Sequence, residues 1–175
     1  LKTTNKLKVL ITEQEIQNKV KEIANKLNEK YKDSEELTLI CVLSGSFMFF
    51  TDLVKHLNMD TKLEFIKVSS YQSTESTGKI KEILFNLPDL KNKDVVIVED
   101  IVDTGLTAKY LIDRINNDFN PKSICFVSLF DKKVSRKTDV SPDIYGFDMN
   151  EEFIVGYGLD CDGKYRNLPY ICLFK

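Results

Sequence analysis

Apolar and polar positions change their spacing along this chain, and each change predicts a new element. Residues 16–31 place apolar side chains three or four positions apart, which is the spacing of an amphipathic helix. The preceding Thr12-Glu13-Gln14-Glu15 has the form of a capping box. We therefore expect a structural helix that begins there and runs for about 18 residues.

Continuous apolar runs indicate buried strands instead. Such runs occupy residues 37–43, 63–69, 95–98 and 123–130. A helical pattern over 47–58 follows the first run, and one over 108–119 follows the third and ends before Asn120-Pro121. Shorter runs predict further strands at residues 83–85, 144–147 and 170–174.

The alternation of strands and helices indicates an α/β fold, with a mostly parallel twisted sheet flanked by helices. The last third of the chain is rich in strands, so we expect it to form a small hood subdomain. At 175 residues the chain is long enough for one sizeable core. We predict a single domain, 1–175, with a hood formed by the N-terminal segment and roughly residues 143–175.

Composition mainly excludes classes of function. The formal net charge of −2 provides no broad basic surface, so no nucleic-acid partner is expected. No apolar run reaches the length of a membrane helix, and the first residues lack the apolar stretch of a signal peptide. These features predict a cytoplasmic protein with no membrane partner.

The cysteines and the histidine limit the chemistry further. Cys41, Cys125 and Cys172 lie inside apolar runs and no C-x-x-C occurs, which is typical of buried free thiols in a reducing compartment. The only histidine, His56, falls in a helical pattern. This argues against a zinc site and against a nucleophile activated by histidine.

Candidate chemistry concentrates at the end of the central apolar run. Residues 95–98 lead into Glu99-Asp100, and Asp103 precedes Thr104-Gly105-Leu106-Thr107 at the start of a helix. Paired carboxylates at the carboxyl end of a parallel strand suit Mg²⁺, or ribose hydroxyls beside it. The small-residue loop offers backbone N–H groups for a phosphate. Asp103 or Thr104 could also cap the helix, which is compatible with phosphate binding.

Two other loops follow predicted strands. Ser44-Gly45-Ser46 is either an ordinary tight connection or a ligand-binding loop at the edge where α/β sheets bind ligands. Residues 70–79 are mostly small and polar and cannot bury themselves. They predict either a lid over a reaction or the tip of a hairpin.

These segments, in this order, resemble the type I phosphoribosyltransferases, and among them the hypoxanthine-guanine phosphoribosyltransferases. Residues 96–107 are similar to the motif that binds 5-phosphoribosyl 1-diphosphate (PRPP) in that family. The resemblance covers roughly residues 7–174. It also includes Leu43-Ser44-Gly45-Ser46, Ser69-Ser70-Tyr71, residues 76–78, Lys132, residues 153–160 and residues 165–169.

The resemblance implies the type I phosphoribosyltransferase fold and a role in purine salvage. It implies Mg²⁺-dependent transfer of the 5-phosphoribosyl group from PRPP to N9 of hypoxanthine or guanine, with xanthine left open. The products would be IMP or GMP plus diphosphate. Two Mg²⁺ ions would act in the closed complex of a homodimer or homotetramer. The alternative is a non-enzymatic nucleotide- or PRPP-sensing regulator, for which a broad basic face would be expected.

The resemblance further implies roles for the acids and the loop after them. Asp103 would be the catalytic acid or base at N7 of the purine. Glu99 and Asp100 would hold the ribose hydroxyls and one Mg²⁺. The 5′-phosphate would be bound by Asp103, Thr104, Gly105, Leu106 and Thr107.

By the same resemblance, Lys132 would donate to the 6-oxo group of the purine. Phe153 would stack on the base, and the backbone of Ile154 would bind its edge. Without the resemblance, Lys132 belongs to a solvated basic loop with Lys133, Arg136 and Lys137, and Phe153 is a core residue.

The remaining implied roles concern the diphosphate. Ser44 and Gly45 would bind it beside a non-proline cis peptide, Arg166 would contact it, and Asp160 would hold the second Mg²⁺. Ser70 and Tyr71 would lie on the lid. The family commonly has Lys or Arg at the position of Ser44, so the backbone and Gly45 are the more secure part of this prediction. Arg166 taken alone would be a surface residue.

Overall fold

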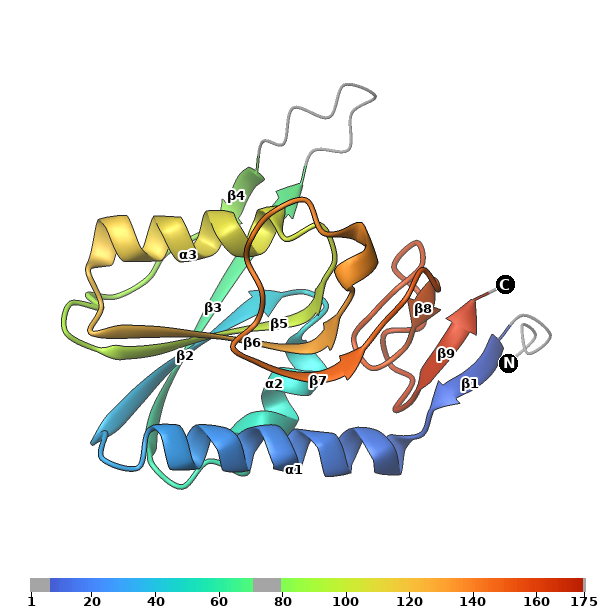
Figure 1. Ribbon diagram of the computed structural model, residues 1–175, viewed down its shortest axis with the longest axis horizontal. Coiled ribbons are helices and arrows are strands. Elements are labelled where there is room, and N and C mark those ends of the chain that lie inside the picture. The colour runs from blue at the N-terminus through green and yellow to red at the C-terminus, as the bar shows by residue number, and fades with distance from the viewer. Residues whose placement is uncertain (1–6, 71–79, 175) are drawn as a thin grey trace.

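Strands and helices of the computed structural model alternate to build one large sheet covered on both faces, with a small sheet at one end (Figure 1). The structure describes residues 7–70 and 80–174. Within them, no helix is long and apolar enough to cross a membrane. The predicted lid, residues 70–79, lies outside the described residues except for its first position.

The large sheet has six strands in the order β4-β3-β2-β5-β6-β7. Their bounds are Ile80–Leu84 (β4), Asp60–Ser70 (β3), Glu36–Leu43 (β2), Asp94–Val102 (β5), Ser123–Asp131 (β6) and Ile144–Asp148 (β7). β4 alone runs antiparallel to its neighbour, and every other pair is parallel. The predicted mostly parallel sheet is confirmed.

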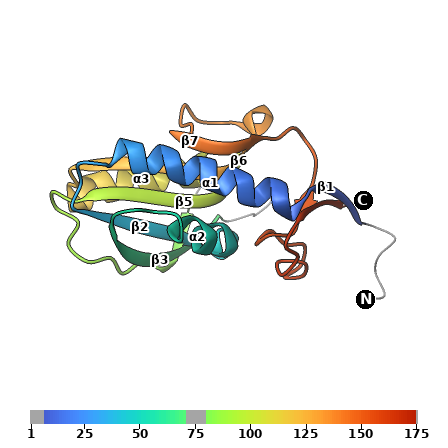
Figure 2. The ribbon, with the colours of Figure 1, turned by 90° about the horizontal axis from the view of Figure 1, so that it is seen from below.

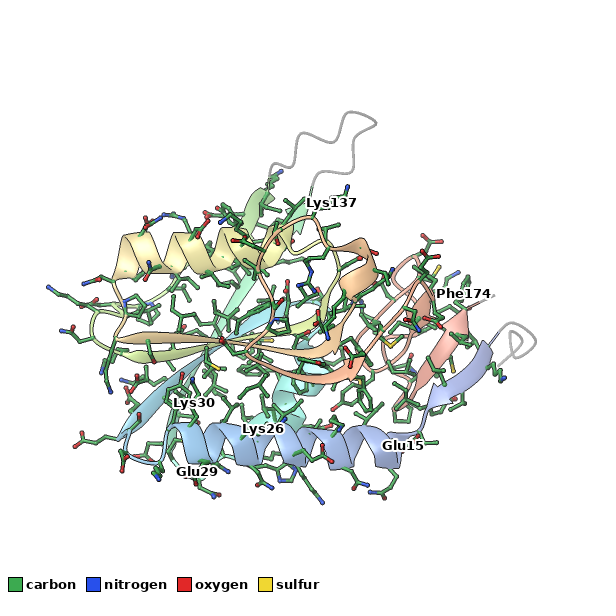
Figure 3. The ribbon with its side chains drawn as sticks, viewed as in Figure 1. Glu15, Lys26, Glu29, Lys30, Lys137 and Phe174 are labelled. Carbon is green, nitrogen blue, oxygen red and sulfur yellow. The ribbon has the colours of Figure 1, made fainter. Side chains whose placement is uncertain are left out.

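The first predicted helix is confirmed as α1, Glu13–Lys30. Its capping box is formed, since the Thr12 backbone N–H donates to Glu15 Oε2 at 2.8 Å and the Glu15 N–H donates to Thr12 Oγ1 at 3.3 Å. Charged side chains such as Glu15, Lys26 and Glu29 lie on its exposed face (Figure 3).

The second helix, α2, spans Phe47–Val54 and ends four residues before the predicted end at 58. The side chain of Asn28 on α1 explains the early end. It donates to the His56 carbonyl at 2.9 Å and accepts from the Asn58 N–H at 3.0 Å, which holds this segment in a non-helical conformation. This contact joins residues about thirty positions apart, so local periodicity does not reveal it.

β5 lies in the middle of the sheet and separates two apolar clusters. Val96 and Val98 pack with α1 and α2 on one face. Val95 and Ile97 pack on the other face with α3, Leu106–Phe119. Seen from below, α1 lies in front of the sheet and α3 behind it (Figure 2). Burial on both faces explains why this strand reads as a continuous apolar run. The cysteines of the apolar runs are free and buried, as expected.

A three-stranded antiparallel sheet, β1-β9-β8, forms the hood. It brings together β1 (Leu7–Ile11), β8 (Ile154–Val155) and β9 (Ile171–Phe174), so both described ends of the chain meet there (Figure 1). The predicted hood from roughly residue 143 includes one strand too many. β7 pairs with β6 in the large sheet, because the Ile144 to Asp148 backbone aligns with Val127 to Asp131.

Candidate active site

The carboxyl ends of the parallel strands face the hood, and a cavity of about 690 Å³ lies there. Its walls come from β2 and the loop after it, from β3, from β5 and from the hood; they include Gly45, Ser69, Asp100, Asp160 and Arg166. A smaller cavity of about 200 Å³ is lined mainly by residues 101–105. Glu99 lines both cavities and so connects them.

The two adjacent acids lie within β5 rather than beyond its end. The strand continues to Val102 because Glu99, Ile101 and Val102 stay in register with β6. Strict alternation would send Glu99 and Asp100 to opposite faces. However, Val98 and Ile101 pack in the same apolar cluster although they are three residues apart, so the alternation breaks between them. Both carboxylates therefore line the large cavity, as expected.

Burial makes this acidic pair hard to ionise. Desolvation, with the Asp100 charge adding to it, raises the pKa of Glu99 to about 8. Desolvation also raises the pKa of Asp100 to about 6, against the opposing effect of backbone N–H groups and of Arg166. No group of the described residues donates a hydrogen bond to the Glu99 carboxylate.

The carboxylate oxygens of Glu99 and Asp100 are suitable ligands for a hard cation. Mg²⁺ is usually held by one or two carboxylates, with substrate phosphate oxygens and water completing its octahedron. The described residues contain no cluster of three or more metal-binding side chains that could hold an ion by themselves. A pair of buried oxygen ligands at the rim of an open cavity is therefore suited to an ion that arrives with a phosphate-bearing substrate.

The loop after β5 leads directly into α3. Gly105 is the N-cap residue at φ +79 and no side chain caps the helix, although Leu106 N–H makes a long contact of 3.4 Å with Thr104 Oγ1. The alternative of a cap from Asp103 is thus not observed. The Asp103 side chain is half exposed and faces the smaller cavity.

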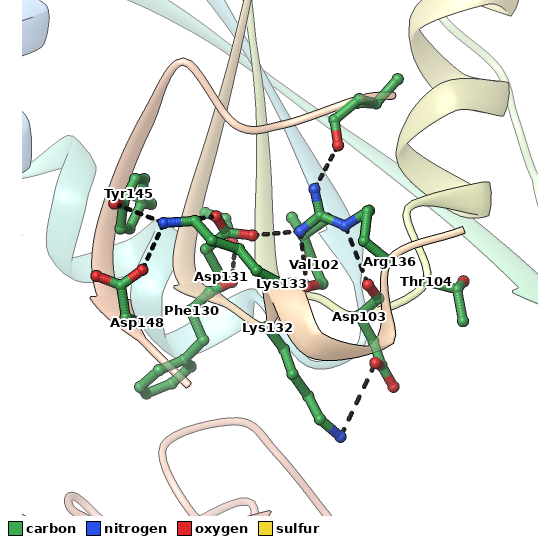
Figure 4. A network of polar contacts seen from close by, with 12 residues as sticks. Val102, Asp103, Thr104, Phe130, Asp131, Lys132, Lys133, Arg136, Tyr145 and Asp148 are labelled. Atoms are coloured by element: carbon green, nitrogen blue, oxygen red, sulfur yellow. Dashed lines mark hydrogen bonds and ion pairs between the residues drawn. The ribbon is translucent and has the colours of Figure 1, made fainter. Parts of the chain in front are cut away.

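Lys132 lies across from Asp103, with 3.9 Å between its Nζ and Asp103 Oδ1 (Figure 4). Its side chain is only 18% exposed, so it does not belong to a fully solvated basic loop. The Lys132 backbone N–H donates to the Val102 carbonyl at 2.9 Å. The ends of β5 and β6 thereby hold an acid and an amine face to face.

Sequence reasoning misses Arg136. The basic loop predicts a solvated cation there, but the Arg136 side chain is 11% exposed and pairs with Asp131, which is 1% exposed. An acid at the end of a buried strand requires a partner. Asp131 after the apolar run 123–130 was therefore a signal that a nearby cation is buried.

Three backbone segments meet at the large cavity. The Leu43–Ser44 peptide is cis, as the resemblance implied. A Cβ on Gly45 would lie 1.5 Å from Asp100 Oδ2, and one on Gly158 would lie 1.9 Å from the Gly45 carbonyl oxygen. Both glycines are required by these approaches.

Arg166 joins this contact from the hood. It donates to the Gly158 carbonyl at 2.6 Å and pairs with Asp160 at 2.6 Å. Its side chain is about one-third exposed and lines the cavity, so it is not a surface residue without partners.

The two hood residues expected to contact the base differ in their solvent exposure. Phe153 is 55% exposed and packs edge-on against Phe174, so the alternative of a core residue is wrong. Ile154 is buried in β8.

The residues expected on the lid are only partly described. Ser70 is the last residue of β3, and Tyr71 lies outside the described residues.

Comparison with known proteins agrees with the resemblance found in the sequence. A family model described as a phosphoribosyl transferase domain matches residues 10–162. The hypoxanthine-guanine phosphoribosyltransferase of Bacillus subtilis (strain 168) is 44% identical over 169 residues, covering 96% of this chain and 93% of that protein. The enzyme of the same name from Dictyostelium discoideum is 42% identical, with 93% and 92% covered.

Solved structures agree with this. A crystal structure of a hypoxanthine-guanine phosphoribosyltransferase from Bacillus anthracis, with a HEPES molecule in its active site, superposes with a TM-score of 0.92. It is 42% identical and covers 98% of this chain and 100% of that one.

Proposed function

Because the chain belongs to the type I phosphoribosyltransferases, and among them to the hypoxanthine-guanine phosphoribosyltransferases, we propose the reaction that its site performs. The protein is a purine-salvage transferase with the type I fold. The proposed reaction transfers the 5-phosphoribosyl group of PRPP to N9 of hypoxanthine or guanine, with Mg²⁺ as cofactor. It yields IMP or GMP and diphosphate.

One observation supports this proposal most directly. Asp103 and Lys132 face each other across 3.9 Å beside the buried pair Glu99 and Asp100. The Lys132 amine would donate to the 6-oxo group and the Asp103 carboxylate would face N7, so that both bind one edge of the purine. The acidic pair would bind the ribose beside it, which would bring N9 of the base close to C1 of the ribose.

The proposed chemistry begins with a purine that carries its proton on N7 and a lone pair on N9. The bond between C1 and the diphosphate oxygen breaks, and its electron pair leaves with the diphosphate. The N9 lone pair forms the new bond to C1. The Asp103 carboxylate takes the proton from N7, which removes the positive charge from the ring.

We assign the cation sites to three carboxylates. Glu99 and Asp100 would hold one Mg²⁺ with the ribose hydroxyls, and Asp160 would help to hold a second. Both Asp160 oxygens already accept contacts, from Arg166 and from the Gly163 N–H at 2.7 Å, but each keeps a second lone pair. The ions supply positive charge for the leaving diphosphate.

The other proposed contacts follow the walls of the cavities. Ser44, Gly45 and Arg166 would bind the diphosphate. Phe153 would stack on the base, with the Ile154 backbone at its edge, and Ser70 with Tyr71 would belong to the closing lid. The 5′-phosphate would be bound by Asp103, Thr104, Gly105, Leu106 and Thr107. We also propose a cytoplasmic homodimer or homotetramer.

The test is a spectrophotometric assay of the wild-type protein with PRPP, Mg²⁺ and hypoxanthine, guanine, xanthine or adenine. We expect turnover with hypoxanthine and guanine and none with adenine, because a buried amine donor rejects a 6-amino group. Turnover of xanthine decides the breadth of specificity. Absence of turnover with all four bases, together with measurable PRPP binding, would favour a PRPP-sensing regulator instead.

A further inference from the structure

Arg136 occupies the space between the two segments that carry Asp103 and Lys132 (Figure 4). Its Nε donates to the Asp103 carbonyl at 3.1 Å, and its Nη2 donates to the Val102 carbonyl at 3.3 Å. Nη1 donates to the Val140 carbonyl, and Nη2 also binds the Asp131 carboxylate. One guanidinium thus holds four acceptors from three separate segments.

Three of the four acceptors belong to Asp103 or to a residue that directly precedes Asp103 or Lys132 in the chain. Asp131 is the last residue of β6 and is followed directly by Lys132. Val102 is the last residue of β5 and is followed directly by Asp103. Arg136 therefore connects the side chain of the residue before Lys132 to the backbone carbonyls of Val102 and Asp103.

Backbone bonds and packing extend this connection. The Lys132 N–H donates to Val102 and the Lys137 N–H donates to Thr104, both at 2.9 Å. The aliphatic part of Arg136 also fills the space beside Gly105, where a Cβ would lie 2.7 Å from Arg136 Cδ. The stem of the arginine thus packs on the phosphate loop, while its charged end holds the base loop.

We propose that Arg136 is a positioning residue that sets the spacing between the Asp103 carboxylate and the Lys132 amine, and through it the recognition of the purine. The inference rests on the proposed function for its kinetic consequences. Arg136 touches no reacting atom in this arrangement, since its polar atoms are engaged by Val102, Asp103, Asp131 and Val140.

Arginine is needed here for its shape. Its planar fork directs several N–H groups in fixed directions, whereas lysine presents a single ammonium. In R136K the Cδ beside Gly105 and the positive charge beside Asp131 remain. The simultaneous bonds to the Val102 and Asp103 carbonyls are lost. This variant therefore separates positioning of the base loop from packing and from charge.

The experiment compares R136K with R114K, measured against wild type. Arg114 is a matched control, since it also pairs with a carboxylate, Glu82 at 3.0 Å, but lies on α3 outside both cavities. For R136K we expect kcat/KM for hypoxanthine at saturating PRPP to fall about 30-fold, because small misplacements at a reacting centre cost up to about 100-fold. PRPP affinity measured by calorimetry should change less than about threefold, and R114K should match wild type.

A second measurement does not depend on turnover. Hydrogen–deuterium exchange should be faster in R136K for peptides covering residues 102–107 and 131–140, and unchanged for peptides of α1. The variant D131N, which removes the charge that holds Arg136, should give the same local pattern. It serves as the second variant if R136K is poorly folded.

Two results would overturn the inference. One is an R136K protein with wild-type kinetics and wild-type exchange in both loops. The other is an equal loss of PRPP affinity and purine turnover, which would indicate a general structural role. If the wild type turns over no base, the proposed function fails, while the exchange comparison still decides whether Arg136 holds the two loops together.

Discussion

β5 carries acidic side chains near both of its ends, and these differ in their hydrogen-bond partners and in the direction of their pKa shifts. At the amino end, Asp94 is 7% exposed and accepts from Ser34 at 2.8 Å, Lys122 at 2.8 Å and Ser123 at 2.7 Å. Although burial opposes it, these bonds hold the pKa of Asp94 below its ordinary value. Near the carboxyl end, Glu99 is equally buried but receives no hydrogen bond from the described residues, and its pKa is raised.

This difference distinguishes a carboxylate that stabilises the fold from one that is available to bind a ligand on the same strand. Solvent exposure alone does not separate them, because both residues are 7% exposed. The hydrogen-bond partners do. A structural carboxylate is satisfied by the protein itself, while a carboxylate left without donors beside a cavity is available for a ligand. Four predictions follow from this contrast.

The largest effect is expected at Asp103, just beyond the carboxyl end of β5. Asp103→Asn should lower kcat by between about 100-fold and 10,000-fold, the usual contribution of a general acid or base. PRPP affinity measured by calorimetry should stay near wild type, because the backbone of the loop is unchanged. D139N, on an exposed loop residue, is the control. Unchanged turnover in D103N would remove Asp103 from the proton-transfer step.

At the amino end, the effect should fall on stability instead. Asp94→Asn should lower the free energy of unfolding in urea by about 2 kcal/mol, because it weakens several hydrogen bonds to a buried charged group. Its kcat/KM should match wild type. D113N, which removes a surface ion pair of 3.3 Å with Lys109, should cost under about 1 kcal/mol. A loss of activity without a loss of stability in D94N would contradict the structural assignment.

A smaller effect is expected on the neighbouring strand. Lys132→Ala should reduce the preference for hypoxanthine over adenine by about tenfold, since one donor to the 6-oxo group is lost. A competition assay with both bases in one reaction measures this ratio directly. K133A is the matched control, because Lys133 points away and pairs with Asp148 at 2.7 Å (Figure 4). Equal selectivity in K132A and wild type would show that another group selects the base.

The smallest effect, at most about 1.4 kcal/mol for each pH unit, is a change in the slope of stability with pH. The pKa of Glu99 is raised in the folded protein, from an ordinary 4.5 to about 8. Its protonated form is therefore favoured by folding, and its contribution to stability falls as pH rises through that interval. For Asp94 the sign is opposite, because a lowered pKa adds stability that is lost as the pH falls.

Chemical denaturation of metal-free protein between about pH 3 and 8 measures these slopes, because the Asp94 contribution is lost only below its ordinary pKa of 3.8, while that of Glu99 falls between 4.5 and about 8. E99Q should flatten the decline toward high pH, and D94N should flatten the decline toward low pH. Mg²⁺ should restore stability at pH 8 in wild type more than in E99Q. Identical slopes in E99Q and wild type would mean that Glu99 titrates as an ordinary surface acid.

Local patterns predicted most of the elements, because their causes are local. The capping box at Thr12 and the apolar face of α3 depend on neighbours within one or two turns. The acids of β5 also stood out, since polar residues directly after a buried run are unusual. The resemblance supplied the roles of Lys132, Phe153 and Arg166, which local chemistry alone assigned to solvent or core.

Other features depend on contacts between distant segments, and no local pattern encodes them. Arg136 meets Val102 across 34 positions, and Asn28 ends α2 from another helix. The 144–147 run predicted a strand but could not show that its partner is β6 rather than the hood. Within the apolar 153–160 run only Ile154–Val155 forms a strand, because Gly156, Tyr157 and Gly158 all adopt positive φ values.

The backbone contact between Gly158 and Gly45 has a consequence for protein engineering. The hood approaches the loop after β2 so closely that a Cβ on Gly158 would meet the Gly45 carbonyl oxygen, while a Cβ on Gly45 itself would meet the Asp100 carboxylate of β5. Tyr157 adds a hydrogen bond of 2.6 Å to Asp52 on α2, which fixes the same junction from the side. A hood transplanted from a relative to change base preference must therefore bring its own Gly-Tyr-Gly segment and dock on an unmodified Gly45. The cut points for such a chimera must therefore leave residues 156–158 inside the transplanted segment.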